Sequence, residues 1–358
     1  MLSPSAAAAA RLLPLLAGRA AAGANHQAAA ALLHARYATS GHSDAGSGSG
    51  QGASGRAVVG LSLAAAAALG ASQLPAALAD AAPQTEPPPN PYARPAASGR
   101  LPQGIVLYQY EVCPFCCKVK AMLDYYKLPY ETVEVNPLTK AELKWSDYRK
   151  VPVVKMDGGR VAKDSSAIMS ELTAELEAAG RGGGDGAKRG GGWRGGGGGG
   201  GGAAAADEER WRRWVDERFV RVLTANIYRS WDETWNTFSY IAGQSHWNWA
   251  SQQAVRLGGS LIMWRVGKGM PGKYGIEGDL RAALYSDVDS FVAALGGREY
   301  LGGSAPNLAD LSMFGVLRAV AGTPTYNDIV INTKIGPWLA RMTMAVGDSS
   351  EVKPAPAK

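Results

Sequence analysis

A C-x-x-C pair, Cys113 and Cys116, follows directly on the β-rich run Ile105–Tyr110 and opens an apolar helical pattern. Pro114 stands in the first turn of that pattern, where its missing N–H would have no partner in any case. Cys113 is therefore expected at the N-terminus of a helix, where free N–H groups and the helix dipole favour a thiolate. This placement predicts a reactive thiol and restricts the fold around it to a strand followed at once by a helix.

A zinc site and inert core thiols are the alternatives for this cluster. Structural zinc takes four ligands, yet Cys117 is the only further cysteine, and His246 is the only histidine beyond residue 42. We therefore predict no metal site, and a lone histidine among aromatic residues is more often packed or exposed than a ligand. Cys116 and Cys117 fall inside the expected helix, so a packing role stays open for both.

The segments that follow predict a β-α-β-β-α order up to residue 180. The expected elements are a strand at Tyr130–Val135, a helix at Leu138–Tyr148, a strand at Val153–Met156, a short strand from Val161 and a helix with Ile168, Leu172 and Leu176 on its apolar face. Strands that alternate with helical patterns in this way indicate an α/β domain.

Two features of this region point to a bound thiol peptide. Val151-Pro152 stands just before a strand, where a cis proline would present the backbone of Val151 to such a ligand. Asp164 or Ser165 can cap the next helix, whose N-terminus attracts anions. Capping alone would explain Asp164 and Ser165, but their combination with C-x-x-C and the Val-Pro step favours a binding site.

The N-terminal region has the composition of targeting and anchoring segments. Residues 1–45 are expected to be a disordered transit peptide, mitochondrial in preference to chloroplast, with a merely disordered Ala-rich tail as the alternative. Residues 57–79 are uncharged and long enough to span a membrane, although alanine drives insertion weakly and a second cleaved export signal is the rival explanation. The Pro-rich residues 80–100 predict an extended tether.

A Gly-rich segment separates the second half of the chain from the first. Residues 181–206 are rich in Gly, cannot bury enough apolar surface to fold, and are predicted to be a flexible linker. Residues 207–345 predict helices, including one with a capping box at Asn307 and Asp310 ahead of an apolar run. Residues 346–358 are predicted to be a disordered tail.

The charge distribution argues against a nucleic-acid partner. The formal net charge of +6 comes from residues 1–100 and from the Gly-rich run. Residues 101–180 and 203–358 together carry as many acidic as basic residues, so the parts expected to fold lack a basic footprint.

Several motifs, taken in order, resemble one family. They are Leu107–Lys120, Leu128–Pro137, Tyr148–Val153, Trp211–Trp214, Asn226–Arg229, Pro306–Leu311 and Pro337-Trp338. The sequence is similar to the membrane-associated prostaglandin E synthase type 2 family, which has glutaredoxin-like and glutathione S-transferase-like features. The resemblance covers about 101–180 and 207–345. It implies a thioredoxin-like α/β domain followed by an all-α domain like that of glutathione transferases.

The resemblance also implies roles for the residues around the cysteines. Cys113 matches the family's catalytic cysteine, and Tyr110 and Phe115 match residues that line the same pocket. Haem is a further cofactor that the family can bind beside glutathione, through the glutathione sulfur and without an axial histidine. Cys117 departs from the family's pattern, because relatives commonly have Ser at this position.

The glutathione contacts of the family match a second group of residues. Val151, next to Pro152, pairs its backbone with the cysteinyl part of the tripeptide. Asp164 and Ser165 hold the γ-glutamyl end.

Three functions stay open at this point. The first is a glutathione-dependent isomerase that converts an endoperoxide such as prostaglandin H2 to prostaglandin E2 with the Cys113 thiolate. The second is a glutaredoxin-type oxidoreductase with Cys113 as nucleophile and Cys116 as resolving thiol. The third is a membrane-tethered protein that binds glutathione and haem without catalysis. The expected partners are glutathione, a hydrophobic lipid peroxide, an organellar membrane through the N-terminal segment and, as an option, a second copy of the chain.

Overall fold

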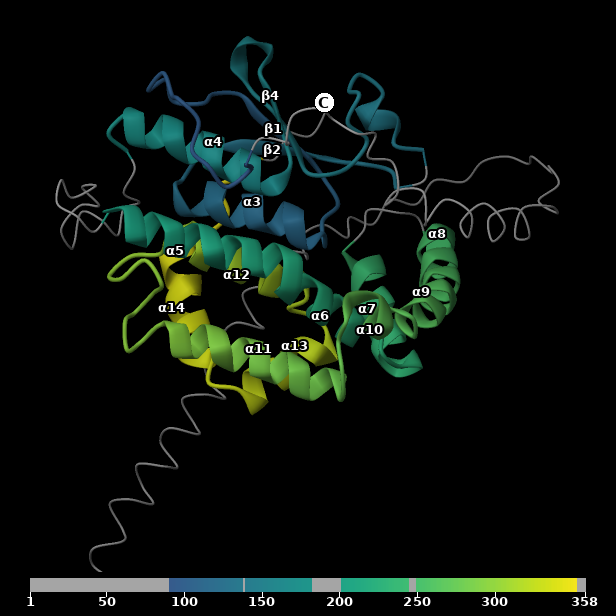
Figure 1. Ribbon diagram of the computed structural model, residues 1–358. Coiled ribbons are helices and arrows are strands. Elements are labelled where there is room, and N and C mark those ends of the chain that lie inside the picture. Colours follow the sequence, from purple (N-terminus) through teal and green to yellow (C-terminus); the bar gives the residue numbers. More distant parts are fainter. Residues whose placement is uncertain (1–89, 138, 182–200, 245–248, 353–358) are drawn as a thin grey trace, which may run out of the picture. The chain divides into compact units, whose positions relative to one another are not determined.

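The computed structural model describes residues 90–137, 139–181, 201–244 and 249–352 (Figure 1). The predicted transit peptide, the predicted membrane segment and all four histidines lie outside these ranges. Among the helices that the structure describes, none is long and apolar enough to cross a membrane. The described residues from Pro91 onward belong to one compact unit.

Four strands form a mixed sheet in the order β2-β1-β3-β4. They are β1 (Ile105–Gln109), β2 (Tyr130–Glu134), β3 (Val153–Lys155) and β4 (Val161–Lys163). Strand β1 runs parallel to β2 and antiparallel to β3, so that Leu107 lies opposite both Thr132 and Val154. Alternate residues of β1 are buried because successive side chains point to opposite faces of the sheet.

Two helices, α3 (Pro114–Tyr125) and α4 (Ser165–Ala178), accompany the sheet, and α3 is buried from Cys116 to its end. The predicted helix at Leu138–Tyr148 is wrong, since the described residues there form only one 3-10 turn, η2 (Ala141–Leu143). Leu143 is the one buried residue of that turn. A segment without an apolar stripe gains too little from packing to offset helix nucleation. A second short turn, η3 (Asp157–Gly159), joins β3 to β4.

The chain is largely helical from Gly201 onward. The elements are α5 (Gly201–Trp214), η5 (Val215–Phe219), α6 (Val220–Ile227), α7 (Trp231–Gly243), α8 (Trp249–Ala254), η6 (Val255–Gly259), α9 (Ser260–Gly267), α10 (Met270–Tyr274), α11 (Leu280–Ala294), α12 (Leu308–Ala319), α13 (Pro324–Asn332) and α14 (Gly336–Val346). The turns η5 and η6 are π-helical and continue α5 into α6 and α8 into α9. Residues 201–206, expected in the linker, are helical because Ala203–Ala206 favour a helix.

The predicted capping box is confirmed at the start of α12. The Asn307 side chain accepts hydrogen bonds from the N–H groups of Ala309 and Asp310, and the Asp310 carboxylate accepts one from the Asn307 N–H. Asp310 is fully buried and also accepts a hydrogen bond of 3.0 Å from the Trp338 indole N–H. A buried carboxylate with this many donors fixes the start of α12 within the core.

Helix α12 packs along α3. A Cβ added at Gly315 would lie 2.5 Å from the Lys118 Cα and 2.7 Å from the Cys117 carbonyl oxygen. Only glycine permits this approach of the two backbones. One hydrophobic cluster accordingly includes Leu107 of the sheet and Phe314 of α12.

The last residues of the predicted tether contact the folded unit. Tyr92 is buried, and its hydroxyl donates a hydrogen bond of 3.2 Å to Asp216. Arg94 forms ion pairs with Glu177 and Glu208. Residues 91–100 are therefore part of the packed structure rather than a free spacer.

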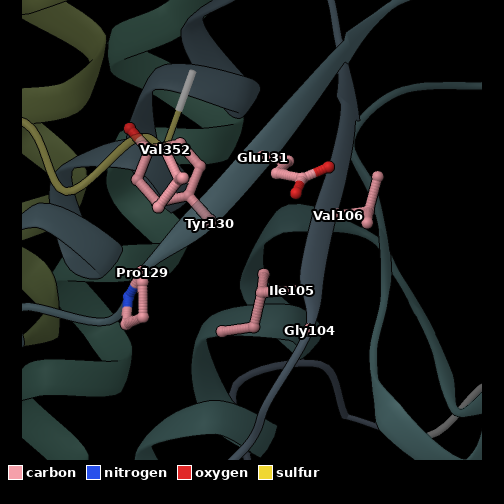
Figure 2. Close-up of a pocket in the computed structure, with 7 residues that line it drawn as sticks. All are labelled: Gly104, Ile105, Val106, Pro129, Tyr130, Glu131 and Val352. Carbon is pink, nitrogen blue, oxygen red and sulfur yellow. The ribbon is translucent and has the colours of Figure 1, made fainter. Parts of the chain in front are cut away.

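The predicted disordered tail is ordered as far as Val352. The Val352 N–H donates a hydrogen bond of 2.7 Å to the Tyr130 carbonyl, and the Tyr130 N–H donates one to Ser350. These bonds satisfy backbone groups on the outer edge of β2, which would otherwise be an exposed template for pairing. Figure 2 shows Val352 directly beside Tyr130.

Substitution of Gly315 tests the approach of α12 to α3. We expect Gly315→Ala to lower the free energy of unfolding by about 1–3 kcal/mol, because the added methyl group must push two backbones apart. The matched control is Gly243→Ala at the end of α7, where a Cβ meets nothing within 4 Å. Urea unfolding of both variants decides the point, and equal stability of the two would contradict the close approach.

Candidate functional site

Cys113 is the residue that immediately precedes α3, and its thiol is half-buried. Its backbone is extended, with φ −75° and ψ 123°, and its N–H donates a hydrogen bond of 3.0 Å to the Tyr110 carbonyl. The Cys113 carbonyl accepts the first hydrogen bond of the helix, from the Cys117 N–H at 2.9 Å. The predicted position of this thiol at a helix N-terminus is thereby confirmed.

The pKa values of the two thiols in the C-x-x-C pair are shifted in opposite directions. The neighbouring Cys116 thiol, as a hydrogen-bond donor to a Cys113 thiolate, and then the N–H groups of Cys116 and Phe115 lower the pKa of Cys113 despite burial. Burial, and then the adjacent Cys113 sulfur, raises the pKa of Cys116 well above its ordinary value. The pair therefore releases its first proton from Cys113 and keeps the second on Cys116.

Cys117 belongs to the core rather than to this pair. It is buried, its thiol donates a hydrogen bond of 3.4 Å to the Glu111 carbonyl, and burial raises its pKa to about 12. A thiol that stays protonated near neutral pH is a poor nucleophile. The structure thus gives Cys117 a packing role.

Two tyrosines flank the reactive sulfur. Tyr110 and Tyr148 pack with Val151 around a small apolar cluster. Burial raises the pKa of both phenols, and the nearby Cys113 adds to the effect. The charge of Asp164 also contributes to the raised pKa of Tyr148.

Tyr148 was not among the predicted site residues, because an isolated tyrosine in a loop carries no signal of its own. Phe115, which was predicted to line the pocket, is partly buried against the core. Its ring centroid lies 5.8 Å from the Lys118 ammonium.

The Val151-Pro152 peptide bond is cis, as the sequence analysis anticipated, and Pro152 is buried. Within the described residues, the backbone N–H and C=O of Val151 have no hydrogen-bonding partner. An extended peptide beside Val151 can supply both missing partners. Val151 therefore leaves open the two backbone groups that such a ligand would need.

Asp164 and Ser165 form the second part of the site, at the start of α4. Asp164 has φ +70°, which is uncommon for a residue other than glycine. Its Oδ1 accepts hydrogen bonds of 2.9 and 3.2 Å from the N–H groups of Ser166 and Ala167. Its Oδ2 and the Ser165 N–H have no partner in the part of the chain that the structure describes. A carboxylate oxygen beside a free helix N–H suits the ammonium and carboxylate groups of an amino-acid end.

A buried ion pair lies beneath these residues. Lys118 is fully buried and donates hydrogen bonds of 3.3 Å to the Ser165 hydroxyl and 3.0 Å to the Ser166 hydroxyl. It also forms an ion pair with Asp216 of η5, which accepts a hydrogen bond of 2.6 Å from Ser166. Burial lowers the pKa of Lys118, and the charge of Asp216 opposes that effect. The pair links the nucleophile helix, the start of α4 and the helical half.

Sequence reasoning missed this pair. Lys118 lies on an otherwise buried helix, and its partner is 98 positions away in the sequence. The one available signal was a lysine inside an apolar pattern, which predicts a buried partner without naming it. The π turn that carries Asp216 has no recognisable sequence signature here.

A pocket of about 180 Å³ lies elsewhere, between the first residues of β1 and β2 and the C-terminal segment (Figure 2). Its lining includes Ile105 and Tyr130, whereas Cys113 follows the opposite end of β1. It is also smaller than the roughly 300 Å³ typical of small-molecule sites. Among the described residues no group of three or more His, Cys, Asp or Glu is placed to hold a metal ion.

The hydrogen bond from Cys116 can be tested by two substitutions. We expect Cys116→Ala to raise the pKa of Cys113 by about one unit, since a hydrogen bond to a charged group is lost. Cys116→Ser keeps a donor and should shift the pKa less. The rate of Cys113 alkylation by iodoacetamide, followed against pH in a Cys117→Ser background, reports the inflection. Identical pH profiles of alkylation for Cys116→Ala and Cys116→Ser would refute hydrogen bonding from residue 116 as the cause of the lowered pKa of Cys113.

The buried ion pair yields a stability prediction. Asp216→Ala leaves the Lys118 ammonium buried without its partner, and we expect it to lower the free energy of unfolding by about 3–5 kcal/mol. Lys118→Met combined with Asp216→Ala should be less destabilising than Asp216→Ala alone. Urea unfolding of the single and double variants measures the coupling, and purely additive effects would mean that the pair is not coupled.

Comparison with known proteins agrees with this architecture. A family described as glutathione S-transferase, N-terminal domain, matches residues 107–179. Glutathione S-transferase I bound with lactoylglutathione is similar in structure, with a TM-score of 0.43 and 16% identity over 68% of this chain and 96% of that one. The family match and the sheet order confirm the predicted thioredoxin-like α/β domain, and the helices from Gly201 onward confirm the helical region after it.

Two relatives are similar over most of their length. Prostaglandin E synthase 2 of Danio rerio is 35% identical over 266 residues, which are 67% of this chain and 71% of that protein. Prostaglandin E synthase 2 of Mus musculus is 32% identical over 275 residues, 69% of this chain and 72% of that protein. The chain belongs to the prostaglandin E synthase 2 family.

Proposed function

We propose that this protein is a glutathione-dependent isomerase that converts an endoperoxide such as prostaglandin H2 into prostaglandin E2. The names of the relatives support the reaction class. The observation that carries the proposal is the low-pKa thiol of Cys113 at a helix N-terminus, in a fold where Val151, Asp164 and Ser165 offer unsatisfied groups. These are the groups that a thiol tripeptide needs.

Glutathione fits the donors and acceptors that the site leaves open. The backbone of Val151 would pair with the cysteinyl peptide group, and Asp164 Oδ2 would accept from the γ-glutamyl ammonium. The Ser165 N–H, at the positive end of α4, would donate to the γ-glutamyl carboxylate. Bound in this way, glutathione would supply a second thiol beside Cys113.

The proposed chemistry consumes no oxidant or reductant. The Cys113 thiolate attacks one peroxide oxygen, the O–O bond breaks, and the second oxygen leaves as an alkoxide that takes up a proton to become a hydroxyl. Loss of the proton from the carbon that bears the first oxygen then forms the ketone and expels the sulfur. The thiolate is regenerated, so the net change is an isomerisation.

A glutaredoxin-type activity is the second candidate, and one observation favours it. Cys116 follows Cys113 in the first turn of α3 and lowers its pKa, as a resolving thiol would, although Cys116 is buried and its own pKa is raised. The structure does not test haem binding, which stays a prediction of the family resemblance. The lipid substrate, the organellar membrane location and a homodimer likewise stay proposals.

Substitution of each cysteine separates the two activities. We expect Cys113→Ser to reduce glutathione-dependent endoperoxide turnover by more than about a hundredfold, because a serine hydroxyl is not ionised near neutral pH. Cys116→Ser should spare that turnover and abolish reduction of a protein disulfide, which needs both thiols. Cys117→Ser is the matched control and should change neither activity.

The measurement is product formation from prostaglandin H2 with and without glutathione. Turnover retained by Cys113→Ser would overturn the proposal. Turnover lost in Cys116→Ser, together with disulfide reduction in the wild type, would favour the oxidoreductase instead.

A further inference from the structure

Helices α8 and α9, joined by η6, form a continuous helical run that rests on α7 through small residues. A Cβ added at Gly259 would lie 2.3 Å from the Phe238 ring, and one added at Gly267 would lie 2.3 Å from the Tyr228 carbonyl oxygen. Ser260, between them, is completely buried. The inner side of this run is thus made by glycine and serine at close backbone approach.

Five large apolar side chains of the same run are exposed, whereas Met263 and Trp264 are half-buried. Leu257 is 57% exposed, Leu261 56%, and Trp249 at the start of the run 75%. Ile262 and Val266 are also exposed, and residues four positions apart lie on the same side of a helix. A helix of a globular protein ordinarily turns its apolar stripe to the core. The exposed apolar residues of this run depart from that rule and do not serve the core of this chain.

The charges around these residues are of one sign. Residues 249–276 contain no Asp or Glu, and their charged residues are Arg256, Arg265, Lys268 and Lys273. Among the described residues, Arg265, Lys268 and Lys273 have no acidic partner. The Lys268 ammonium instead lies 4.0 Å from the centroid of the Trp264 ring. Exposed leucines bordered by unpaired cations are the pattern of helices that lie in a membrane interface.

We propose that the outward side of this run, which we call the α8–α9 face (Trp249, Leu257, Leu261, Ile262 and Val266), docks on an anionic lipid surface. The leucines enter the boundary between headgroups and acyl chains, while Arg265 and Lys268 pair with lipid phosphates and carboxylates. This contact is separate from the N-terminal segment at 57–79 and does not depend on the proposed isomerase activity.

Charge decides between a lipid surface and a second copy of the chain. Two copies meeting through this face by a two-fold axis would bring like cations together with no carboxylate from residues 249–276 to offset them. An anionic bilayer offers both a hydrophobic layer and a dense negative surface. We therefore assign the lipid surface as the occupant.

A photocrosslink from within the face tests the proposal in the full chain. The photoreactive residue p-benzoylphenylalanine replaces Leu261, and the protein is irradiated with vesicles of phosphatidylcholine containing about 30% phosphatidylserine. We expect lipid adducts that are several-fold fewer with pure phosphatidylcholine and that disappear near 1 M salt. Because the label reports only from position 261, contact made by residues 57–79 produces no signal.

The matched control carries the same label at Ile331 of α13, which is 76% exposed and lies outside the face. Arg265→Glu with Lys268→Glu, added to the Leu261-labelled chain, should reduce the adduct about tenfold, and circular dichroism confirms that this variant is folded. Equal adducts at 261 and 331, no lipid adduct at 261, or an adduct to a second copy of the chain would each overturn the proposal. An adduct unaffected by the double substitution would also overturn it.

Discussion

The burial of charged residues along α3 is the constraint on which the rest of the structure depends. Lys118, Lys120 and Asp124 are almost completely inaccessible, and each would strongly destabilise the fold without a partner. Their partners come from separate parts of the chain: Asp216 of η5, Glu111 of the loop before the helix, and Arg318 of α12. Together with the contact at Gly315, these pairs specify how the helical half docks on the sheet.

The same arrangement explains the chemistry of the site. The body of α3 is fixed by its ion pairs, so its first turn presents the N–H groups of Phe115 and Cys116 to the Cys113 sulfur at a defined place. Lys118, one turn further, orients Ser165 and Ser166 at the start of α4. Two helix N-termini are therefore held near one another, one stabilising a thiolate and the other offering an anion site. Stabilisation of charge by fixed dipoles requires this kind of rigidity.

Local patterns predicted the fold and much of the site. The strand, the C-x-x-C step, the cis Val151-Pro152 bond and the box at Asn307 each depend on residues a few positions apart. The Lys118–Asp216 pair was missed because it joins segments that only the folded chain brings together. The helix predicted at Leu138–Tyr148 is wrong because tertiary packing overrides local preference. Its residues favour a helix locally, but Leu143 is the only residue of the 3-10 turn formed there that is buried.

Helices α3 and α9 both depart from the rule that charges lie outside and apolar residues inside, and they do so in opposite ways. In α3 the buried charges are neutralised within the chain, and the result is a rigid element directly after Cys113. In η6 and α9 the apolar side chains of Leu257, Leu261, Ile262 and Val266 are exposed, while the buried side of the run includes Ser260 and Gly267, the latter at close backbone approach to Tyr228. The exposed apolar side chains of this run contribute little to the packing of the core, in contrast to Met263, which packs against it. Those side chains are consequently available to a surface outside the chain, and the unpaired cations beside them select one that is negatively charged.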